Sequence, residues 1–165
     1  MTPLREVPAG QRAALLPLVD RSFSGLYRLH ARRTLRSAPW VLASVEAGDA
    51  AGLIMLSLLE PGAGYVYYVA VDPPHRRKGL GLVLLDAGLE VLRDAGARET
   101  FSCVKLTNVP MVLLLRARGF REIGFRALTR ARGLAGAVRL MTRMVAAPGE
   151  TVFVRGREPG AEPAA

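Results

Sequence analysis

Hydrophobic and polar residues alternate with two different periods along the chain, and these periods separate the expected helices from the expected strands. Apolar residues recur every three or four positions over residues 11–23, and two leucines followed by two arginines have the same spacing over residues 26–36, which predicts two helices. Pro17 lies inside the first stretch, so we expect a kink or a late helix start there. A short alternation of apolar and charged residues at 4–7, closed by Pro8, predicts an edge strand.

The centre of the chain carries three apolar runs that predict three consecutive antiparallel strands. The runs cover residues 40–46, 51–60 and 65–71. Residues 47–49, Ala-Gly-Asp, favour a tight hairpin turn between the first two runs, and the Pro-Gly-Ala-Gly stretch at 61–64 favours the next turn. Two prolines after Asp72 stop the third strand, because proline has no backbone N–H to donate to a sheet.

A helix and a strand follow the third run. Leucines recur at helical spacing over residues 82–92, and Gly96 is placed to end that helix. Residues 100–104 predict a buried strand. This strand should run parallel to residues 65–71, because a strand, a helix and a strand in this order form a right-handed crossover.

The last third of the chain predicts one more helix and a closing hairpin. Asn108 marks the start of the helix, and Gly119 followed by Phe120 marks its end. We expect strands at residues 121–129 and 138–145, joined by a loop at residues 130–136. A short strand is expected at residues 151–154, before a flexible tail at residues 156–165. The expected organisation is one domain over residues 1–147 and a largely flexible C-terminal extension over residues 148–165.

Composition narrows the class of protein. The chain has 165 residues, half of them apolar, which suits one domain with a sizeable core. Lys and Arg outnumber Asp and Glu by 23 to 14, and the formal charge of +9 suits an anionic cofactor, an acidic partner or nucleic acid. The arginines are scattered and no aromatic RNA-binding motif is present, so nucleic acid is the less favoured partner.

The single cysteine, Cys103, excludes an intrachain disulfide. The first residues lack the apolar core of a signal peptide, and no apolar run reaches the length of a membrane span. We therefore expect a cytoplasmic protein without a membrane partner and without a metal site. The oligomeric state is left open.

A basic, glycine-containing loop follows the third predicted strand. Arg76, Arg77 and Lys78 precede Gly79-Leu80-Gly81, and a helix begins directly afterwards. Unpaired amides at a helix start, a partial positive charge and missing Cβ atoms together form a site for phosphate groups. The nucleotide-triphosphate loop is excluded because no Lys-Ser or Lys-Thr follows, and the dinucleotide fingerprint is excluded because Leu84 stands where a small residue is needed.

The pattern Arg76-x-x-Gly79-x-Gly81, with Val-Ala-Val-Asp-Pro at residues 69–73 before it and two leucines at residues 84–85 after it, resembles the acetyl-coenzyme A signature of the GNAT superfamily of N-acetyltransferases. The nearest branch acetylates the N-terminal alanine of ribosomal proteins. The resemblance implies the acyl-CoA N-acyltransferase fold: an α/β fold with a mixed, mostly antiparallel sheet, flanking helices and a central, splayed pair of parallel strands.

The resemblance also implies which residues bind acetyl-CoA. Backbone amides around the loop would hold the pyrophosphate, three strand residues would pair with the pantetheine arm, and an asparagine would bind that arm or simply cap its own helix. These residues are Val69, Ala70, Val71, Arg76, Arg77, Lys78, Gly79, Leu80, Gly81, Leu82 and Asn108.

The chain departs from the family at both catalytic positions. Leu115 stands where related enzymes carry the tyrosine that protonates the thiolate, and Cys103 stands where the ribosomal-protein branch carries a glutamate base. Tyr67 and Tyr68 are the candidate replacements, since neighbouring strand residues point to opposite faces and one of the two should face the cleft. Cys103 is either a thiol beside the thioester or a small core residue, and His30 is a weaker candidate base.

These residues predict an N-acetyltransferase that moves an acetyl group from acetyl-CoA directly to a primary amine. A protein N-terminal α-amine is slightly preferred over a small-molecule amine, because an α-amine with a pKa near 8 is partly neutral without a base. Two alternatives stay open. The chain is either a coenzyme-binding regulatory module with little turnover or, less favoured, a basic nucleic-acid-binding domain.

Overall fold

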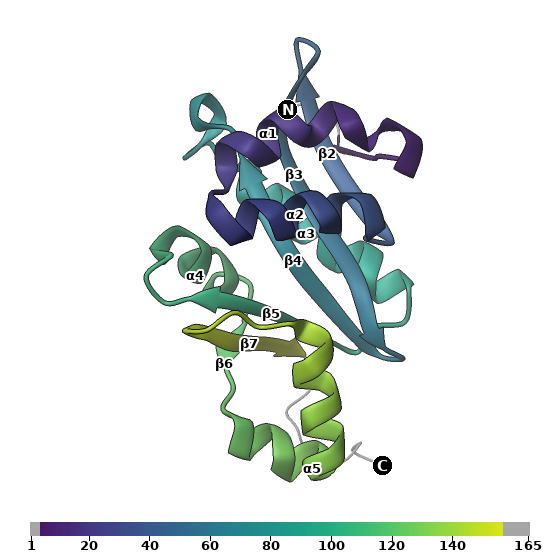
Figure 1. Cartoon of the computed structure of the whole chain (residues 1–165), viewed down its shortest axis with the longest axis vertical. Coiled ribbons are helices and arrows are strands. Elements are labelled where there is room, and N and C mark those ends of the chain that lie inside the picture. The colour runs from purple at the N-terminus through teal and green to yellow at the C-terminus, as the bar shows by residue number, and fades with distance from the viewer. Residues whose placement is uncertain (1–3, 157–165) are drawn as a thin grey trace. The chain divides into compact units, whose positions relative to one another are not determined.

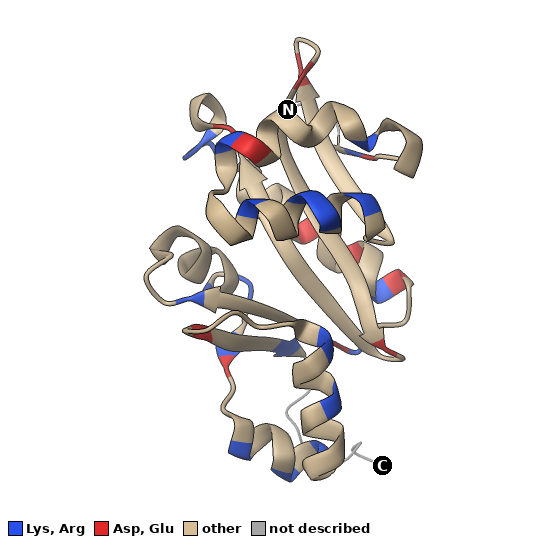
Figure 2. Cartoon of the chain, viewed as in Figure 1, with Lys and Arg blue, Asp and Glu red and all other residues tan. Residues whose placement is uncertain are grey.

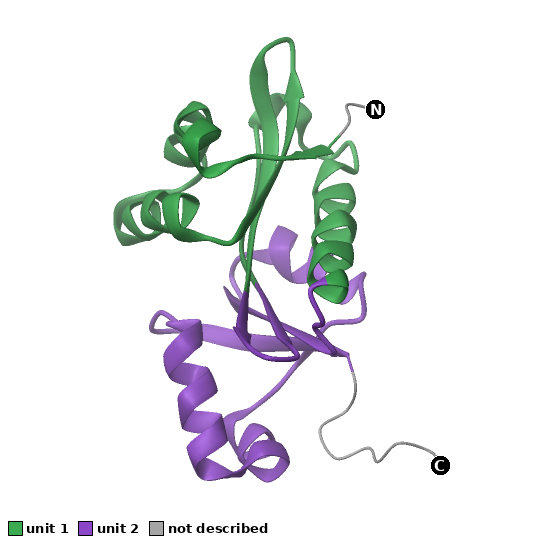
Figure 3. Ribbon diagram, turned by 90° about the vertical axis from the view of Figure 1, so that its right-hand side faces the viewer, with its two compact units in different colours: residues 1–57, 66–94 green, residues 58–65, 95–165 purple. Residues whose placement is uncertain are grey.

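The computed structural model describes residues 4–156, which form helices around a mixed sheet of seven strands (Figure 1). The strand order is β1-β2-β3-β4-β5-β7-β6. The β4–β5 ladder is parallel, and the β1–β2, β2–β3, β5–β7 and β6–β7 ladders are antiparallel. The predicted fold class is therefore confirmed. The chain forms two compact units (Figure 3). Unit 1 consists of Met1–Ser57 and Val66–Asp94, and unit 2 consists of Leu58–Tyr65 and Ala95–Ala165.

Unit 1 begins with an edge strand and two helical segments, much as the sequence predicts. Strand β1 is Leu4–Glu6, the 3₁₀ helix η1 is Ala9–Leu15, α1 is Leu16–Ser22 and α2 is Gly25–Ser37. Pro17 lies in the first turn of α1, where a missing N–H costs no hydrogen bond, so the predicted late helix start is confirmed.

The central strands of unit 1 form the predicted hairpin. Strand β2 is Trp40–Glu46 and strand β3 is Asp49–Glu60. The two strands pair antiparallel, and the last pair before the turn is Glu46 with Asp49. Ala47 and Gly48 both have positive φ angles, 52° and 91°, as a two-residue turn between twisted strands requires. Strand β4, Ala63–Val71, starts two residues earlier than predicted.

Helices cover both faces of the strands in unit 1, with α1 and α2 on one side and α3, Leu80–Asp94, on the other (Figure 3). Helix α3 lies so close to the strands that a Cβ atom at Gly88 would stand 2.8 Å from Cδ1 of Ile54. The other face buries Leu18 and Leu35 against Met55 and their neighbours. Between β4 and α3, the 3₁₀ helix η2, Pro73–His75, leads into the glycine loop.

Unit 2 is built around β5, Glu99–Lys105. Residues Ala63–Tyr65 of β4 pair in parallel with Glu99–Phe101, which confirms the predicted parallel strands. This ladder covers the first three residues of each strand, whereas β7, Glu150–Gly156, pairs with β5 along its whole length. Helix α4, Val109–Arg116, follows β5 as predicted.

The predicted closing hairpin is wrong. Of the strand expected at residues 121–129, only β6, Arg121–Glu122, is present, and the loop at 130–136 and the strand at 138–145 both belong to α5, Phe125–Met144. Ala, Leu, Arg and Met dominate this segment, and Ala137, Leu140 and Met144 are buried at helical spacing. These local preferences favour a helix where we predicted the hairpin. Gly133, with φ 71°, interrupts the helix inside the expected loop.

The short strand predicted at residues 151–154 is present as part of β7, so residues 150–156 of the C-terminal extension belong to the sheet. The rest of the expected flexible tail, residues 157–165, lies outside the described residues. None of the helices within residues 4–156 is long and apolar enough to cross a membrane.

Candidate active site

The loop between β4 and α3 has a concave backbone at the position of the predicted phosphate site. Arg77 and Gly79 adopt left-handed conformations with φ angles of 59° and 84°. The first hydrogen bonds of α3 run from the amides of Leu82 and Val83 to the carbonyl of Gly79, so the amides of Leu80 and Gly81 precede them. Successive amides beside left-handed residues form concavities that bind anions. A diphosphate needs hydrogen-bond donors of this kind.

Side chains of unit 1 brace this loop from three sides. The Nε atom of Arg76 donates to the carbonyl of Val71 at 2.9 Å, and Arg21 pairs with Asp72 at 3.0 Å. The side chain of His75 is only 26% exposed, and its Nε2 atom lies 2.7 Å from a carboxylate oxygen of Glu46. The loop is therefore held in one shape by its own neighbours.

The donor set and the available space fit the pyrophosphate of acetyl-CoA. No heavy atom lies within 4 Å of the position that a Cβ atom on Gly79 would occupy, so the space beside this backbone is open. Arg77 and Lys78 are exposed at the same place and add two positive charges. Val69 and Val71, which are predicted to pair with the pantetheine arm, are half-buried at the end of β4 that leads into this loop.

A histidine and two tyrosines meet on the helical face of β4. Nδ1 of His30 on α2 lies 2.7 Å from the hydroxyl oxygen of Tyr68, and Oγ1 of Thr34 lies 3.4 Å from the same nitrogen. The ring of Phe23 packs edge-on against Tyr68 with centroids 4.8 Å apart. The ring centroids of Tyr67 and His30 are 6.4 Å apart. We predicted that the two tyrosines point to opposite faces of the strand, but both rings lie near His30.

Cys103 is half-buried on β5 in unit 2, with its Sγ atom 3.9 Å from Sδ of Met144. Burial raises the pKa of this thiol to about 11, and a hydrogen bond with Tyr65 offsets only part of that rise. The surroundings therefore keep the thiol protonated at neutral pH, which limits its use as a nucleophile or base.

We expect Cys103 to react slowly with iodoacetamide at pH 7.5, because a pKa near 11 in place of 9.0 leaves about 100-fold less thiolate. The alkylation rate of the folded protein, followed by mass spectrometry, should rise about tenfold per pH unit up to pH 10. The same protein in urea provides the reference rate. Equal rates in the folded and unfolded protein at pH 7.5 would show that the pKa is not raised.

Asn108 and Leu115 belong to α4 in unit 2. The side-chain oxygen of Asn108 accepts a hydrogen bond from the amide of Met111 at 3.3 Å, so the residue caps its helix as one of the two predicted roles requires. Leu115, at the position of the family's acid, has no exposed surface. Leu115 therefore offers no proton donor at this position.

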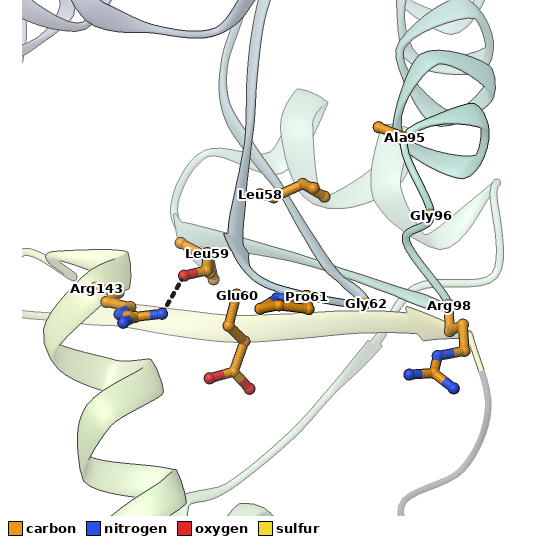
Figure 4. A pocket seen from close by; sticks show the side chains of 9 residues that line it. All are labelled: Leu58, Leu59, Glu60, Pro61, Gly62, Ala95, Gly96, Arg98 and Arg143. Atoms are coloured by element: carbon orange, nitrogen blue, oxygen red, sulfur yellow. Dashed lines mark hydrogen bonds between the residues drawn. The ribbon is translucent and has the colours of Figure 1, made fainter.

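A pocket of about 720 Å³ lies in unit 2, beside the β3–β4 turn and the segment after α3 (Figure 4). Arg143 donates to the carbonyl of Leu59 at 2.5 Å, and Arg98 stands at the other end of the pocket. Glu60, which ends β3, is paired with Arg132 and with Arg139. Sequence reasoning missed this pocket, because its lining comes from four separate stretches of the chain.

Residues 4–156 contain no cluster of three His, Cys, Asp or Glu side chains suited to a metal ion. Sequence reasoning also missed the contact between His30 and Tyr68, although it considered each residue separately. Residue spacing carries no signal for this contact, because 38 positions separate the two residues.

The model of the acetyltransferase (GNAT) family matches residues 13–120. A mycothiol acetyltransferase of Clavibacter sepedonicus is 36% identical over 85 residues, which cover 52% of this chain and 28% of that protein. An N-alpha-acetyltransferase of Sulfurisphaera tokodaii is 33% identical over 61 residues, which cover 36% of each chain. The chain therefore spans well under half the length of these curated relatives.

Solved structures share the fold. The ribosomal-protein-S18-alanine N-acetyltransferase of Escherichia coli superposes with a TM-score of 0.65 at 17% identity, covering 93% of this chain and 91% of that one. Two further structures with this fold contain coenzyme A.

Proposed function

Because the chain belongs to the acetyltransferase (GNAT) family, we propose that it binds acetyl-CoA at the β4–α3 loop and transfers the acetyl group to a primary amine. The observation that supports this proposal is the braced loop at Arg77–Gly81, where two left-handed residues and the first amides of α3 offer donors of the kind that bind a diphosphate. In this proposal, the backbone of Val69–Val71 pairs with the pantetheine arm, and Asn108 acts as the cap of its own helix.

The acceptor that we favour is the α-amine of a polypeptide. At neutral pH an α-amine is roughly a tenth neutral, whereas a lysine amine is almost fully protonated, so a site without a carboxylate base favours the α-amine. The names of the relatives include both an N-alpha-acetyltransferase and an acetyltransferase for the small molecule mycothiol, so a small amine is the second candidate.

The surface of α2 supports a polypeptide acceptor. Leu26 and Leu29, directly before His30, are 83% and 68% exposed, and Arg33 and Arg36 continue the same stripe at helical spacing. Figure 2 shows several positively charged positions along this helix. An apolar and cationic stripe fits a peptide that has an apolar residue near its amine and acidic residues further on.

We expect thiol release from acetyl-CoA to be fastest with peptides that have a free α-amine followed by Asp or Glu at positions three to five. A peptide with Lys at those positions should react at least about fivefold more slowly, which corresponds to about 1 kcal/mol of charge complementarity. Peptides with a blocked N-terminus and an internal Lys, together with small amines, complete the panel. The charge-reversed variant Arg33→Glu should reverse the preference between acidic and basic peptides.

The same assay tests the alternatives. Coenzyme binding by calorimetry without thiol release from any amine would support the regulatory module, which the buried Leu115 favours. Fast release with small amines and none with peptides would overturn the polypeptide acceptor while keeping the enzyme. No coenzyme binding at all would overturn the proposed function.

A further inference from the structure

The hydroxyl of Tyr68 and the Nδ1 atom of His30 are 2.7 Å apart, and no assigned role accounts for this contact. We propose that Tyr68 is the catalytic proton carrier of the acetyl transfer and that His30 is its positioning residue and transient proton store. This inference rests on the proposed function and names the groups that perform its proton transfers. Tyr68, His30 and the residues that hold them in place, Thr34 and Phe23, all lie in unit 1.

The position of Tyr68 along β4 places its hydroxyl near the reacting end of acetyl-CoA. The phosphate end of the coenzyme is expected at the loop that follows β4, and the pantetheine arm is expected beside Val69–Val71. Each strand residue advances the chain by about 3.3 Å, so an arm that runs back along these three residues brings its thioester to the level of Tyr68 or just before it. The strand that binds the arm therefore also carries the phenol.

His30 gives this phenol a partner that can take up its proton at neutral pH. An isolated tyrosine has a pKa near 10 and is a poor base at neutral pH, whereas an imidazole has a pKa near 6.5 and accepts or releases a proton readily. With its ring hydrogen on Nε2, His30 accepts the hydroxyl proton of Tyr68 at Nδ1. The longer contact from Thr34 and the edge-on ring of Phe23 keep both partners in place.

Charged groups around the pair are already engaged with one another. On the neighbouring helix α1, Asp20 pairs with Arg32 and Arg21 pairs with Asp72. The short hydrogen bond between His30 and Tyr68 is a direct polar contact through which the imidazole acts on the phenol.

The transfer balances with one proton moved from nitrogen to sulfur. When the neutral amine attacks, an N–C bond forms, the π bond of the thioester carbonyl opens onto its oxygen, and the nitrogen becomes positively charged. The Tyr68 oxygen takes a proton from this nitrogen while its own proton passes to Nδ1 of His30. The carbonyl then re-forms from the negative oxygen, the C–S bond breaks and its electron pair leaves with the sulfur. Nδ1 returns its proton to the Tyr68 oxygen, and the phenol proton goes to the sulfur. The products are the amide and free coenzyme A, and both side chains end in their starting forms.

The positions at which the family keeps its catalytic groups cannot supply these steps here. Leu115 has no ionisable group and no exposed surface. Burial raises the pKa of Cys103 to about 11, so the thiol neither accepts the amine proton nor donates readily at neutral pH. A phenol coupled to an imidazole supplies both the base and the acid that these two positions lack.

Three single variants and one double variant test this pair. Tyr68→Phe removes the proton carrier, His30→Ala removes the store, and His30→Asn keeps a hydrogen-bond acceptor near Nδ1 that does not take up a proton at neutral pH. The matched control is Tyr65→Phe, which removes the same hydroxyl from the same strand, where it donates to the carbonyl of Met144. For each variant, kcat and the KM for acetyl-CoA are measured from thiol release with the best acceptor, and coenzyme binding is measured by calorimetry.

We expect Tyr68→Phe, His30→Ala and His30→Asn each to lower kcat by about 100-fold, with the KM for acetyl-CoA within about threefold of wild type. The double variant of Tyr68→Phe with His30→Asn should be no slower than Tyr68→Phe alone, because the two residues act as one unit. Tyr65→Phe should stay within about threefold of wild type in kcat.

Two outcomes would overturn the inference. If His30→Asn kept wild-type kcat, His30 would be only a hydrogen-bond partner, and if Tyr68→Phe kept wild-type kcat, the phenol would carry no proton. If wild-type protein bound acetyl-CoA but released no thiol with any amine, the proposed function would fail and this inference with it. That result is distinct from loss of kcat in the variants alone.

Discussion

Replacing Gly81 by glutamate is expected to weaken acetyl-CoA binding by at least about 100-fold, which is about 2.7 kcal/mol, without destabilising the protein. Gly81 is the second residue of α3, and its φ angle is not in the left-handed region, so any L-residue is compatible with this backbone. A glutamate there exchanges a flexible glycine for a better helix former and places its negative charge at the positive end of the helix. The same charge occupies the site that we propose for the diphosphate.

The two effects of Gly81→Glu have opposite signs, which makes the result informative. Calorimetric titration should show the loss of binding, while urea unfolding should show stability equal to wild type or up to about 1 kcal/mol higher. The matched control is Gly124→Glu at the start of α5, where φ is −83° and no heavy atom lies within 4 Å of the added Cβ. This control should bind acetyl-CoA like wild type. Binding by Gly81→Glu within threefold of wild type would place the coenzyme elsewhere.

Replacing Arg12 by methionine is expected to lower the free energy of unfolding by about 3 kcal/mol. Arg12 is only 5% exposed, and its guanidinium donates to the carbonyls of Val7, Leu35, Ala38 and Pro39. Burial lowers the pKa of Arg12, but a guanidinium keeps its charge at neutral pH. Methionine preserves much of the side-chain volume and leaves these carbonyls, including those at the end of α2, without their donor.

Urea denaturation at pH 7 measures this loss, with Arg33→Met as the control. Arg33 lies on the same helix that Arg12 caps, and its side chain is exposed, so the change should cost less than about 0.5 kcal/mol. Arg12→Lys should fall between the two, because a lysine keeps the charge but not the planar fork of donors. If Arg12→Met and wild type had the same free energy of unfolding, water would hydrogen-bond to these carbonyls as well as the guanidinium does.

The C-terminal third of the chain shows where sequence reasoning failed. The helical period of the buried residues Ala137, Leu140 and Met144 is present in the sequence, whereas we predicted a strand at residues 138–145. The short run at residues 151–154 was correctly predicted as a strand, although its partner β5 lies almost fifty positions earlier. The residues of a strand favour its extended backbone, whereas the packing of the whole sheet decides which strand pairs with it.

The sequence by itself determined the loop at Gly79–Gly81, the hairpin at Ala47–Gly48 and the late start of α1 at Pro17. Glycine, proline and the helix start restrict the backbone within a few residues, so their effects can be predicted without the rest of the chain. Only the tertiary structure decided that Arg12 is buried and that His30 meets Tyr68. Both contacts join residues more than twenty positions apart in the chain. They form because α2 packs against the sheet and brings these side chains together. The local sequences around them resemble those of ordinary exposed positions in helices and strands, so the sequence gives no sign of the contacts.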